Sequence, residues 1–569
     1  MRRSYQLAVF LLAALASVPV APAQTKPSEP ALPVFEDIST KIGINFKHEA
    51  SLTSQKYLIE SMGPGVALFD YDNDGRLDIF VVNGAYIADP MPTGALPDKK
   101  DPRYWNRLYH QRPDGSFEDV TVKAGLAGSE YGMGVAVGDY DNDGFEDLYV
   151  TGYPRNRLYK NNGNGTFTDV TDAAGVAGSG WSVSATFVDY NNDGRLDLFV
   201  TRYLDWSFDK NIFCGEHRPG YRAYCHPDSF PPATNLLFRN DGKGKFTDVS
   251  KEAGIAVPGG KSLGVALGDY DGDGNIDIFV ANDSVREFLL HNRGHGIFEE
   301  VGLESGAAVD EDGHVFAGMG VDFADYDNDC RPDIVIGDLA NQMYPLYRNE
   351  GDGTFSYATH SSGLGKISML SSGWGLRLFD YDNDGWKDLF VGQGHVLDTI
   401  ELTQPNLQYR QRPLMARNNG KGFVDVSAQS GLPFQQRWSA RGVATGDIDN
   451  DGNVDVVVGT NNGSLYVLRN RGANANHWIT LALTGTTSNR DAIGAQVRLV
   501  SATGRQQCAM VTTSSSYASA SDKRIHFGLG SDESARSIQI RWPSGLIQIL
   551  PNVKADQSLV IKEPRTGSP

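Results

Sequence analysis

One acidic nine-residue motif occurs seven times and constrains the fold of this chain more than any other feature of its sequence. The copies are DYDNDGRLD (70–78), DYDNDGFED (139–147), DYNNDGRLD (189–197), DYDGDGNID (269–277), DYDNDCRPD (325–333), DYDNDGWKD (380–388) and DIDNDGNVD (447–455). Consecutive copies start 50 to 80 residues apart. A variable period of this size is typical of a repeat array with surface insertions.

Each motif lies between two segments that have the composition of strands. A short apolar segment such as GVALFD (65–70) precedes it, and a β-branched and aromatic segment such as LDIFVVNG (77–84) follows it. A second recurring element, for example RLYKNNGNGTFTDVTDAAG (157–175), has two apolar segments around a Gly/Asn turn and predicts a β-hairpin. Four strands per repeat and seven repeats predict an all-β fold with a seven-bladed β-propeller.

The two ends of the repeat region complete each other. The segment VFEDIS (34–39) matches the last strand of a repeat but lacks the hairpin partner before it, and the final repeat stops at LYVLRN (465–470) without that strand. We therefore predict that residues 35–39 pair with the last blade and close a ring. An open solenoid would leave both halves unpaired.

The acidic loops have the pattern of a calcium site. Carboxylates at positions 1, 3, 5 and 9, a backbone carbonyl at position 7 and Gly at position 6 suit a hard cation and a tight turn. An EF-hand would need an acidic residue at position 12, where the first loop has Val81. Acidic hairpins without an ion are the alternative, and seven copies with one spacing favour up to seven structural Ca²⁺ ions. The predicted ligands, loop by loop, are Asp70, Asp72, Asp74, Arg76, Asp78; Asp139, Asp141, Asp143, Phe145, Asp147; Asp189, Asn191, Asp193, Arg195, Asp197; Asp269, Asp271, Asp273, Asn275, Asp277; Asp325, Asp327, Asp329, Arg331, Asp333; Asp380, Asp382, Asp384, Trp386, Asp388; and Asp447, Asp449, Asp451, Asn453, Asp455. The fifth site is predicted to be the weakest, because Cys330 replaces Gly and Pro332 stiffens the turn.

The N-terminus and the net charge indicate an exported protein. The segment MRRSYQLAVFLLAALASVPVAPAQ has a basic start, an apolar core and an Ala-Pro-Ala cleavage site, and predicts a signal peptide over 1–23. Loss of this leader changes the net charge from -19 to -21, and seven Ca²⁺ ions would change it by +14, to -7. An acidic surface disfavours nucleic acid as a partner, and no later segment has the length of a membrane span. We predict secretion to the periplasm or the extracellular space.

Three insertions, at about 85–106, 201–233 and 393–412, interrupt the repeats. The second carries Cys214 and Cys225, which predict a local disulfide, with two free thiols as the alternative. The sequence gives no reason to pair Cys330 with Cys508. Six aromatic residues in the first two insertions are candidate contacts for a glycan or protein partner: Tyr104, Trp105, Trp206, Phe208, Tyr221 and Tyr224.

The pattern changes from about residue 473, where strand-like segments without acidic loops predict a small β-sandwich. The segments SNRDAIGAQVRL (488–499), HFGLG (526–530) and RWPSG (541–545) resemble the ASPIC/UnbV domain, and the loops resemble the FG-GAP/VCBS repeats of integrin α propellers. Together they are similar to the cartilage acidic protein family over residues 34–564. The resemblance implies a secreted calcium-binding propeller associated with adhesion or extracellular binding. The segment TSSSYASAS (513–521) departs from it, since a Gly is expected before the Tyr.

These predictions divide the chain into five parts. They are a signal peptide (1–23), a linker (24–33), the propeller (34–471), the ASPIC/UnbV domain (472–565) and a tail (566–569).

Two classes of function are consistent with the sequence. The first is a non-enzymatic binding, adhesion or scaffold module whose insertions contact an extracellular glycan or protein. The alternative is an exported polysaccharide lyase or dehydratase on the propeller face, with His226 or His395 as the base. In the C-terminal region Arg490, Asp491 and His526 are read either as a ligand site or as a buried ion pair and a loop-anchoring histidine.

Overall fold

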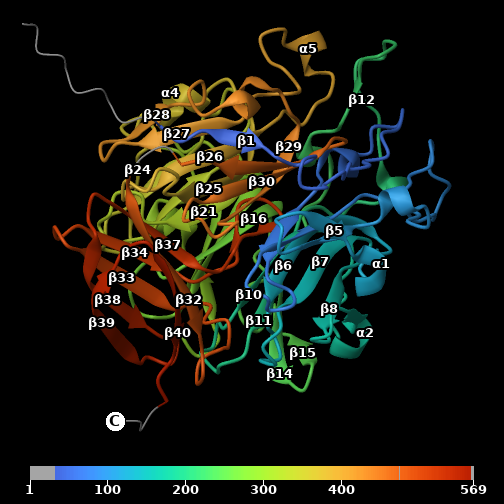
Figure 1. Ribbon diagram of the computed structural model, residues 1–569. Helices are drawn as coiled ribbons and strands as arrows, with labels where there is room; N and C mark the ends of the chain where they lie inside the picture. Colours follow the sequence, from blue (N-terminus) through green and yellow to red (C-terminus); the bar gives the residue numbers. More distant parts are fainter. Residues whose placement is uncertain (1–31, 473–474, 566–569) are drawn as a thin grey trace, which may run out of the picture. The chain divides into compact units, whose positions relative to one another are not determined.

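A computed structural model describes residues 32–472 and 475–565. The predicted signal peptide (1–23), most of the predicted linker and the tail (566–569) lie outside these residues. Strands dominate the described chain, and its five α-helices have four or five residues each (Figure 1). The prediction of an all-β fold is confirmed.

Seven antiparallel units of four strands form the blades; six come from one repeat each, and the seventh combines three strands of the last repeat with the N-terminal strand Phe35–Asp37. In order from the innermost strand outward they are β2 (Val66–Phe69), β3 (Asp78–Val81), β4 (Arg107–Gln111), β5 (Phe117–Asp119); β6 (Tyr131–Gly138), β7 (Asp147–Tyr153), β8 (Arg157–Asn161), β9 (Phe167–Asp169); β10 (Ser182–Val188), β11 (Asp197–Arg202), β14 (Leu236–Gly242), β15 (Lys245–Asp248); β16 (Ser262–Gly268), β17 (Asp277–Val285), β18 (Phe288–Asn292), β19 (Phe298–Glu300); β21 (Val321–Ala324), β22 (Asp333–Ile336), β23 (Leu346–Asn349), β24 (Phe355–Tyr357); β25 (Gly373–Phe379), β26 (Asp388–Gln393), β27 (Leu414–Asn418), β28 (Phe423–Asp425); and β29 (Ala440–Gly446), β30 (Asp455–Thr460), β31 (Leu465–Asn470), β1 (Phe35–Asp37).

The blades form a closed ring. Each innermost strand contacts the innermost strand of the next blade, and β29 of the seventh blade contacts β2 of the first. Strand β1 pairs antiparallel with β31, with Phe35 opposite Asn470 and Asp37 opposite Leu468. The predicted closure of the last blade by the N-terminal segment is therefore confirmed.

A repeated hydrogen bond links each blade to the preceding one. The side-chain amide of an Asn or Gln at the end of the third strand donates to the backbone carbonyl at position 2 of the neighbouring acidic loop. The donor and acceptor residues are Gln111 and Ile448, Asn161 and Tyr71, Asn240 and Tyr140, Asn292 and Tyr190, Asn349 and Tyr270, Asn418 and Tyr326, and Asn470 and Tyr381. These seven bonds include the junction between the last and first blades, so they stabilise the ring as a whole.

The remaining elements of the ring lie in connections and insertions. The helices are α1 (Thr121–Ala124), α2 (Thr171–Ala174), α3 (Gly302–Ser305), α4 (Leu364–Ser368) and α5 (Ile400–Thr403), with 3-10 turns η1 (Leu58–Ser61), η2 (Pro102–Tyr104), η3 (Phe208–Lys210), η4 (Pro227–Ser229) and η5 (Leu432–Gln435). The second insertion forms the hairpin β12 (Cys214–Gly215) and β13 (Arg222–Ala223), and β20 (Phe316–Ala317) pairs with the end of β17.

The C-terminal domain contains two sheets, as the sequence predicts for a small sandwich. One has the order β37 (Ile525–Gly530), β32 (His477–Thr484), β40 (Gln557–Lys562), and the other β34 (Gln506–Met510), β33 (Gln496–Ser501), β38 (Ser534–Arg541), β39 (Ile547–Lys554). Their inward side chains form one hydrophobic cluster with the second, third and fourth blades, so the domain packs on the propeller.

One segment of the C-terminal domain lies inside the propeller ring. This central hairpin, residues 513–521 with β35 (Ser514–Ser515) and β36 (Ser519–Ala520), is buried throughout and contacts the innermost strands. It forms hydrogen bonds with six of the seven blades. The approach is close, because a Cβ atom at Gly65 would lie 2.0 Å from the carbonyl oxygen of Ala518. Ser516, where a Gly was expected, has φ +72° and accepts the N–H of Leu376.

Two disulfides are present in the described chain. Cys214–Cys225 closes the second insertion, as predicted. Cys330–Cys508 joins the fifth acidic loop to β34 of the C-terminal domain, a pairing that the sequence did not indicate. The second bond links segments 178 positions apart, so it fastens the domain covalently to the ring.

Candidate functional site

The backbone folds each acidic loop around its first carboxylate. In the first loop, Asp70 accepts the N–H groups of Asp74 (3.0 Å) and Gly75 (2.8 Å), and Asp74 accepts that of Arg76 (3.0 Å). The second, third, fifth, sixth and seventh loops repeat these three bonds. Each loop thus brings its own predicted ligand residues together.

The carboxylate at position 9 begins the second strand and is buried in every loop. In the second loop, Asp147 accepts the N–H of Asn161 at 2.7 Å and that of Tyr140 at 3.2 Å. A carboxylate oxygen can accept more than one bond. Position 9 therefore fixes the loop against the blade and still offers lone pairs to a cation.

Several ligand oxygens have no hydrogen-bond partner although they are buried. They are Oδ1 of Asp72, Asp141 and Asp327 at position 3, Oδ1 of Asp269 at position 1 and Oδ2 of Asp197 at position 9. Ligand oxygens of Asp139, Asp141 and Asp147 lie within 4.8 Å of one another. Burial and neighbouring carboxylates raise the pKa of Asp139 to about 7 and that of Asp78 to about 8. Converging oxygen donors with unsatisfied lone pairs fit a hard cation such as Ca²⁺.

A basic residue of the third strand faces most of the loops, and the sequence reasoning missed it. In the sixth blade Arg417 contacts Asp382 and Asp384, each at 2.8 Å. The third-strand residues at this place are His110, Lys160, Arg239, His291, Arg348, Arg417 and Arg469. Six contact the carboxylate at position 3 of their own loop. Arg239 pairs with Asp241 instead, in the one repeat where position 3 is the neutral Asn191. The sequence does contain a signal for this contact, because a basic residue precedes the Asn or Gln of the third strand in all seven repeats.

The fifth loop keeps the geometry of the others despite its two unusual residues. Cys330 has φ +66°, the left-handed conformation that Gly adopts at this position, and its N–H donates to Asp325 at 3.0 Å. Its side chain forms the disulfide to Cys508. The substitution of Gly is therefore explained by the covalent link, and the lower calcium affinity of this loop stays a prediction.

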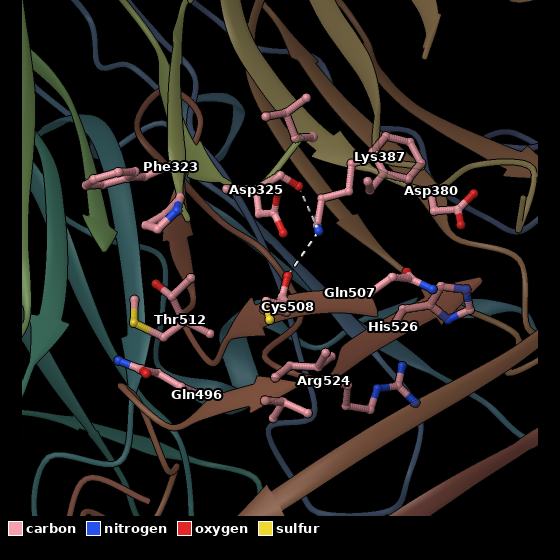
Figure 2. A pocket seen from close by; sticks show the side chains of 18 of the residues that line it. Phe323, Asp325, Asp380, Lys387, Gln496, Gln507, Cys508, Thr512, Arg524 and His526 are labelled. Carbon is pink, nitrogen blue, oxygen red and sulfur yellow. Dashed lines mark hydrogen bonds between the residues drawn. The ribbon is translucent and has the colours of Figure 1, made fainter. Parts of the chain in front are cut away.

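The C-terminal domain covers the inner side of several loops. The resulting cavity has a volume of about 420 Å³. Figure 2 shows Asp325 and Asp380 on one side of it, and Cys508 and His526 on the other. Lys387 spans it and donates to the backbone carbonyls of Asp325 (3.0 Å) and Cys508 (3.1 Å). The first carboxylates of four loops line this space, so the domain limits solvent access to them.

The polar residues selected in the C-terminal domain contact the acidic loops. Asp491 accepts the N–H of Asp139 at 2.6 Å and pairs with Lys523, whereas Arg490 lies 4.0 Å from Asp139. The expected ion pair between Arg490 and Asp491 is therefore wrong, because each residue has a different partner. His526 contacts Asn383 of the sixth loop at 2.6 Å, which agrees with its interpretation as a loop anchor.

Most of the insertion aromatics are not exposed on the protein surface. Tyr104, Trp206, Phe208 and Tyr224 are buried, and only Trp105 and Tyr221 are partly exposed. Trp206 packs between the rings of Tyr57, Tyr153, Trp181 and Phe208. The interpretation of these four residues as exposed contacts for a glycan or protein is wrong, since their side chains are buried.

A second cavity, of about 260 Å³, brings together the two histidines considered as catalytic bases. His226 and His395 both line it, although they lie far apart in the sequence. Nδ1 of His395 accepts the N–H of Leu397 (3.0 Å), and Nδ1 of His226 accepts that of Asp228 (3.3 Å). Burial lowers the pKa of His395 to about 4. Each imidazole ring therefore stabilises the backbone of its own loop through this hydrogen bond.

A buried carboxyl group lies behind this second cavity. Glu60 accepts hydrogen bonds from Thr53 and from the hydroxyl of Tyr224, which lines the cavity. Burial raises the pKa of Glu60 to about 7. The folded state therefore binds this proton more tightly than the unfolded chain does.

We expect the Glu60→Gln variant to have a flatter dependence of stability on pH. A raised carboxyl pKa makes stability fall as pH rises from about 4.5 to about 7, by about 3 kcal/mol for this group. Urea unfolding at several pH values and fixed calcium measures the difference between variant and wild type. Parallel profiles across this interval would contradict the assignment.

The fold and its loops define a class of protein: a seven-bladed β-propeller with acidic inter-strand loops and a C-terminal β-sandwich docked on them. The model of the FG-GAP-like repeat matches residues 70–150, 139–200, 229–280, 269–336 and 325–391, and that of ASPIC and UnbV matches residues 485–568. The chain belongs to the FG-GAP-like repeat family and carries a C-terminal ASPIC/UnbV domain.

Known proteins resemble parts of the chain. Cartilage acidic protein 1 of Homo sapiens is 29% identical over 304 residues, which cover 52% of this chain and 43% of the human protein. The match thus spans less than half the length of that relative. The structures of BBS1N in complex with ARL6DN and of YCF48 bound to D1 peptide each align with a TM-score of 0.40, at 11% and 9% identity. Each covers 78% of this chain and 99% of its own.

No helix in residues 32–472 and 475–565 has both the length and the apolar character needed to cross a membrane.

Proposed function

We propose that this protein is a secreted, calcium-stabilised β-propeller that acts as a non-catalytic binding module for an extracellular glycan or protein. The observation that carries the calcium assignment is the set of buried ligand oxygens without hydrogen-bond partners in the acidic loops. The ions would be held by the 35 residues predicted from the sequence, within the loops to which those residues belong. Bound Ca²⁺ would neutralise carboxylates that the fold holds close together.

The proposed export is supported by disulfide chemistry. All four cysteines of the chain form disulfides, and such bonds persist in oxidising compartments. The predicted signal peptide agrees with this compartment. Export also exposes the protein to calcium concentrations that suit sites of the extracellular type, with Kd of about 10⁻⁴ to 10⁻³ M.

The proposed binding role is supported by the division between blades and insertions. The blades repeat one geometry, whereas the insertions differ in length, and two of them line a cavity together with residues of the blades. Loops on a rigid scaffold commonly carry recognition. Binding is favoured over lyase or dehydratase chemistry because the candidate bases His226 and His395 both use Nδ1 to hold their own loops.

We expect the Asp141→Asn variant to bind about one calcium ion fewer than the wild type at sub-saturating calcium. The substitution removes one negative charge from the second loop, where Oδ1 of Asp141 has no other partner. Ligand charge is a main determinant of calcium affinity in such loops. Equilibrium dialysis with elemental analysis gives the number of ions.

Asp172→Asn is the matched control, because Asp172 is exposed and pairs with Arg155 away from the acidic loops. It should leave the calcium count unchanged. Equal counts for all three proteins at every calcium concentration would exclude the second loop as a site.

A further inference from the structure

The second cavity lies at the end of β17 opposite its acidic loop and has the composition of a small-molecule site. Its lining is mostly apolar, and Tyr203, Tyr224 and Trp374 contribute aromatic surface. A volume of about 260 Å³ is just below the range of pockets for drug-sized ligands, so the ligand must be small. No sequence motif indicated this cavity, because its wall combines two insertions with three blades.

One carboxylate lines the cavity. Oδ2 of Asp283 accepts the hydroxyl of Tyr203, and Oδ1 accepts that of Ser284 at 2.8 Å. These bonds fix the orientation of the group without neutralising it. Within the part of the chain that the structure describes, Asp283 forms no ion pair, and the nearby Lys261 is paired with Asp228.

Two further carboxyl groups lie behind Asp283. The strand pairing places Asp283 opposite Ala317, whose N–H donates to Oδ1 of Asp338 at 3.0 Å. Glu287, four residues beyond Asp283, accepts the N–H of Asn282. Both acids are completely buried, and each has one oxygen without a partner, Oδ2 of Asp338 and Oε1 of Glu287. Neither forms an ion pair among the described residues.

Asp283 gives the cavity one carboxyl group with which a cation can pair. Burial raises the pKa of Asp283, and burial together with the neighbouring Asp283 raises the pKa values of Asp338 and Glu287 well above their usual range. His395, the buried histidine of the lining, has its pKa lowered to about 4 and is neutral at pH 7. A ligand that enters with a positive charge would stabilise the ionised form of Asp283 and meet an apolar wall.

We propose that this cavity binds a small organic cation, an ammonium group on an apolar or aromatic body, with the ammonium group at Asp283 and the body against Tyr203, Tyr224 and Trp374. A carboxylate together with aromatic faces is the usual protein environment for such cations. The proposal names a ligand class for the binding role proposed above and rests on that role. It does not depend on calcium.

Phenethylammonium is the probe, with 2-phenylethanol as its neutral analogue and 3-phenylpropionate as its anionic analogue. Calorimetric titration of the full chain in saturating calcium should give binding of the ammonium compound about tenfold tighter than that of the alcohol, and no binding of the carboxylate. Asp283→Asn should weaken binding of the ammonium compound by about tenfold and leave the affinity for the alcohol unchanged. Asp205→Asn changes an exposed acid of the second insertion that pairs with Lys210; it is the control and should change the affinity of neither compound.

A second variant tests the cavity independently of the charge. Ala340→Phe places a ring in the lining and should abolish binding of both the ammonium compound and the alcohol. Equal affinities for the three probes, an unchanged affinity in Asp283→Asn, or no binding of the ammonium compound at millimolar concentration would each overturn the proposal. Thermal unfolding with and without calcium should be the same for Asp283→Asn and the wild type. Failure at the cavity is thereby distinguished from failure of the calcium assignment.

Discussion

The Tyr517→Ala variant is expected to lose about 4 kcal/mol of unfolding free energy. Tyr517 belongs to the central hairpin and is completely buried inside the ring. Its ring meets that of Trp374 edge-on, with centroids 4.9 Å apart, and its hydroxyl donates to the carbonyl of Met62 at 2.9 Å. The substitution leaves both a cavity and an unpaired carbonyl. Chemical denaturation in saturating calcium measures the loss.

Two controls separate the contributions to this effect. Tyr517→Phe removes only the hydrogen bond and should cost about 1 kcal/mol. Tyr86→Ala removes an exposed ring of the first insertion and should have a small effect. If Tyr517→Ala unfolds at the same denaturant concentration as Tyr86→Ala, the central hairpin does not support the ring.

Removal of calcium is expected to lower the unfolding temperature by the largest amount of any change described. When the calcium concentration is about one hundred times the Kd of a loop, that loop contributes about 2.7 kcal/mol to the free energy of unfolding. Up to seven loops add to the shift. Without ions the carboxylates repel one another, and the basic residues of the third strands offset only part of that charge. Thermal unfolding in EDTA and across a calcium titration measures the shift.

Magnesium at matched ionic strength is the control for this experiment. Mg²⁺ requires a compact octahedral coordination shell and loses its bound water slowly. It should therefore raise the unfolding temperature much less than Ca²⁺ does. Identical unfolding temperatures in EDTA, magnesium and calcium would mean that the loops fold without metal. In that case the third-strand cations would be sufficient counter-ions for them.

The features of the fold that recur along the chain could be predicted from the sequence. The nonapeptide copies fixed the number of blades, and the incomplete repeats at residues 34–39 and 465–470 identified the ring closure that β1 and β31 form. The Cys214–Cys225 bond was also within reach, because both cysteines lie in one short insertion. A local structure can be predicted from the sequence when its residue pattern recurs in every repeat.

Features that depend on contacts between distant segments were not predictable. From its composition the central hairpin is expected to be an exposed Ser-rich loop, because only the folded ring buries it. The Cys330–Cys508 bond requires the C-terminal domain to dock on the fifth loop. The insertion aromatics were misread because composition does not distinguish an exposed contact from a core residue. Trp206 packs among four other rings, three of which come from distant segments of the chain.

Calcium binding by the acidic loops is the central feature proposed for this protein. The most direct measurement is the anomalous difference density of a crystal grown in calcium. We expect peaks in six or seven loops, each among the carboxylates at positions 1, 3 and 5, with the fifth loop, between Asp325 and Asp333, the weakest. Absence of density in every loop at saturating calcium, or density confined to surface acids outside the loops, would contradict the account.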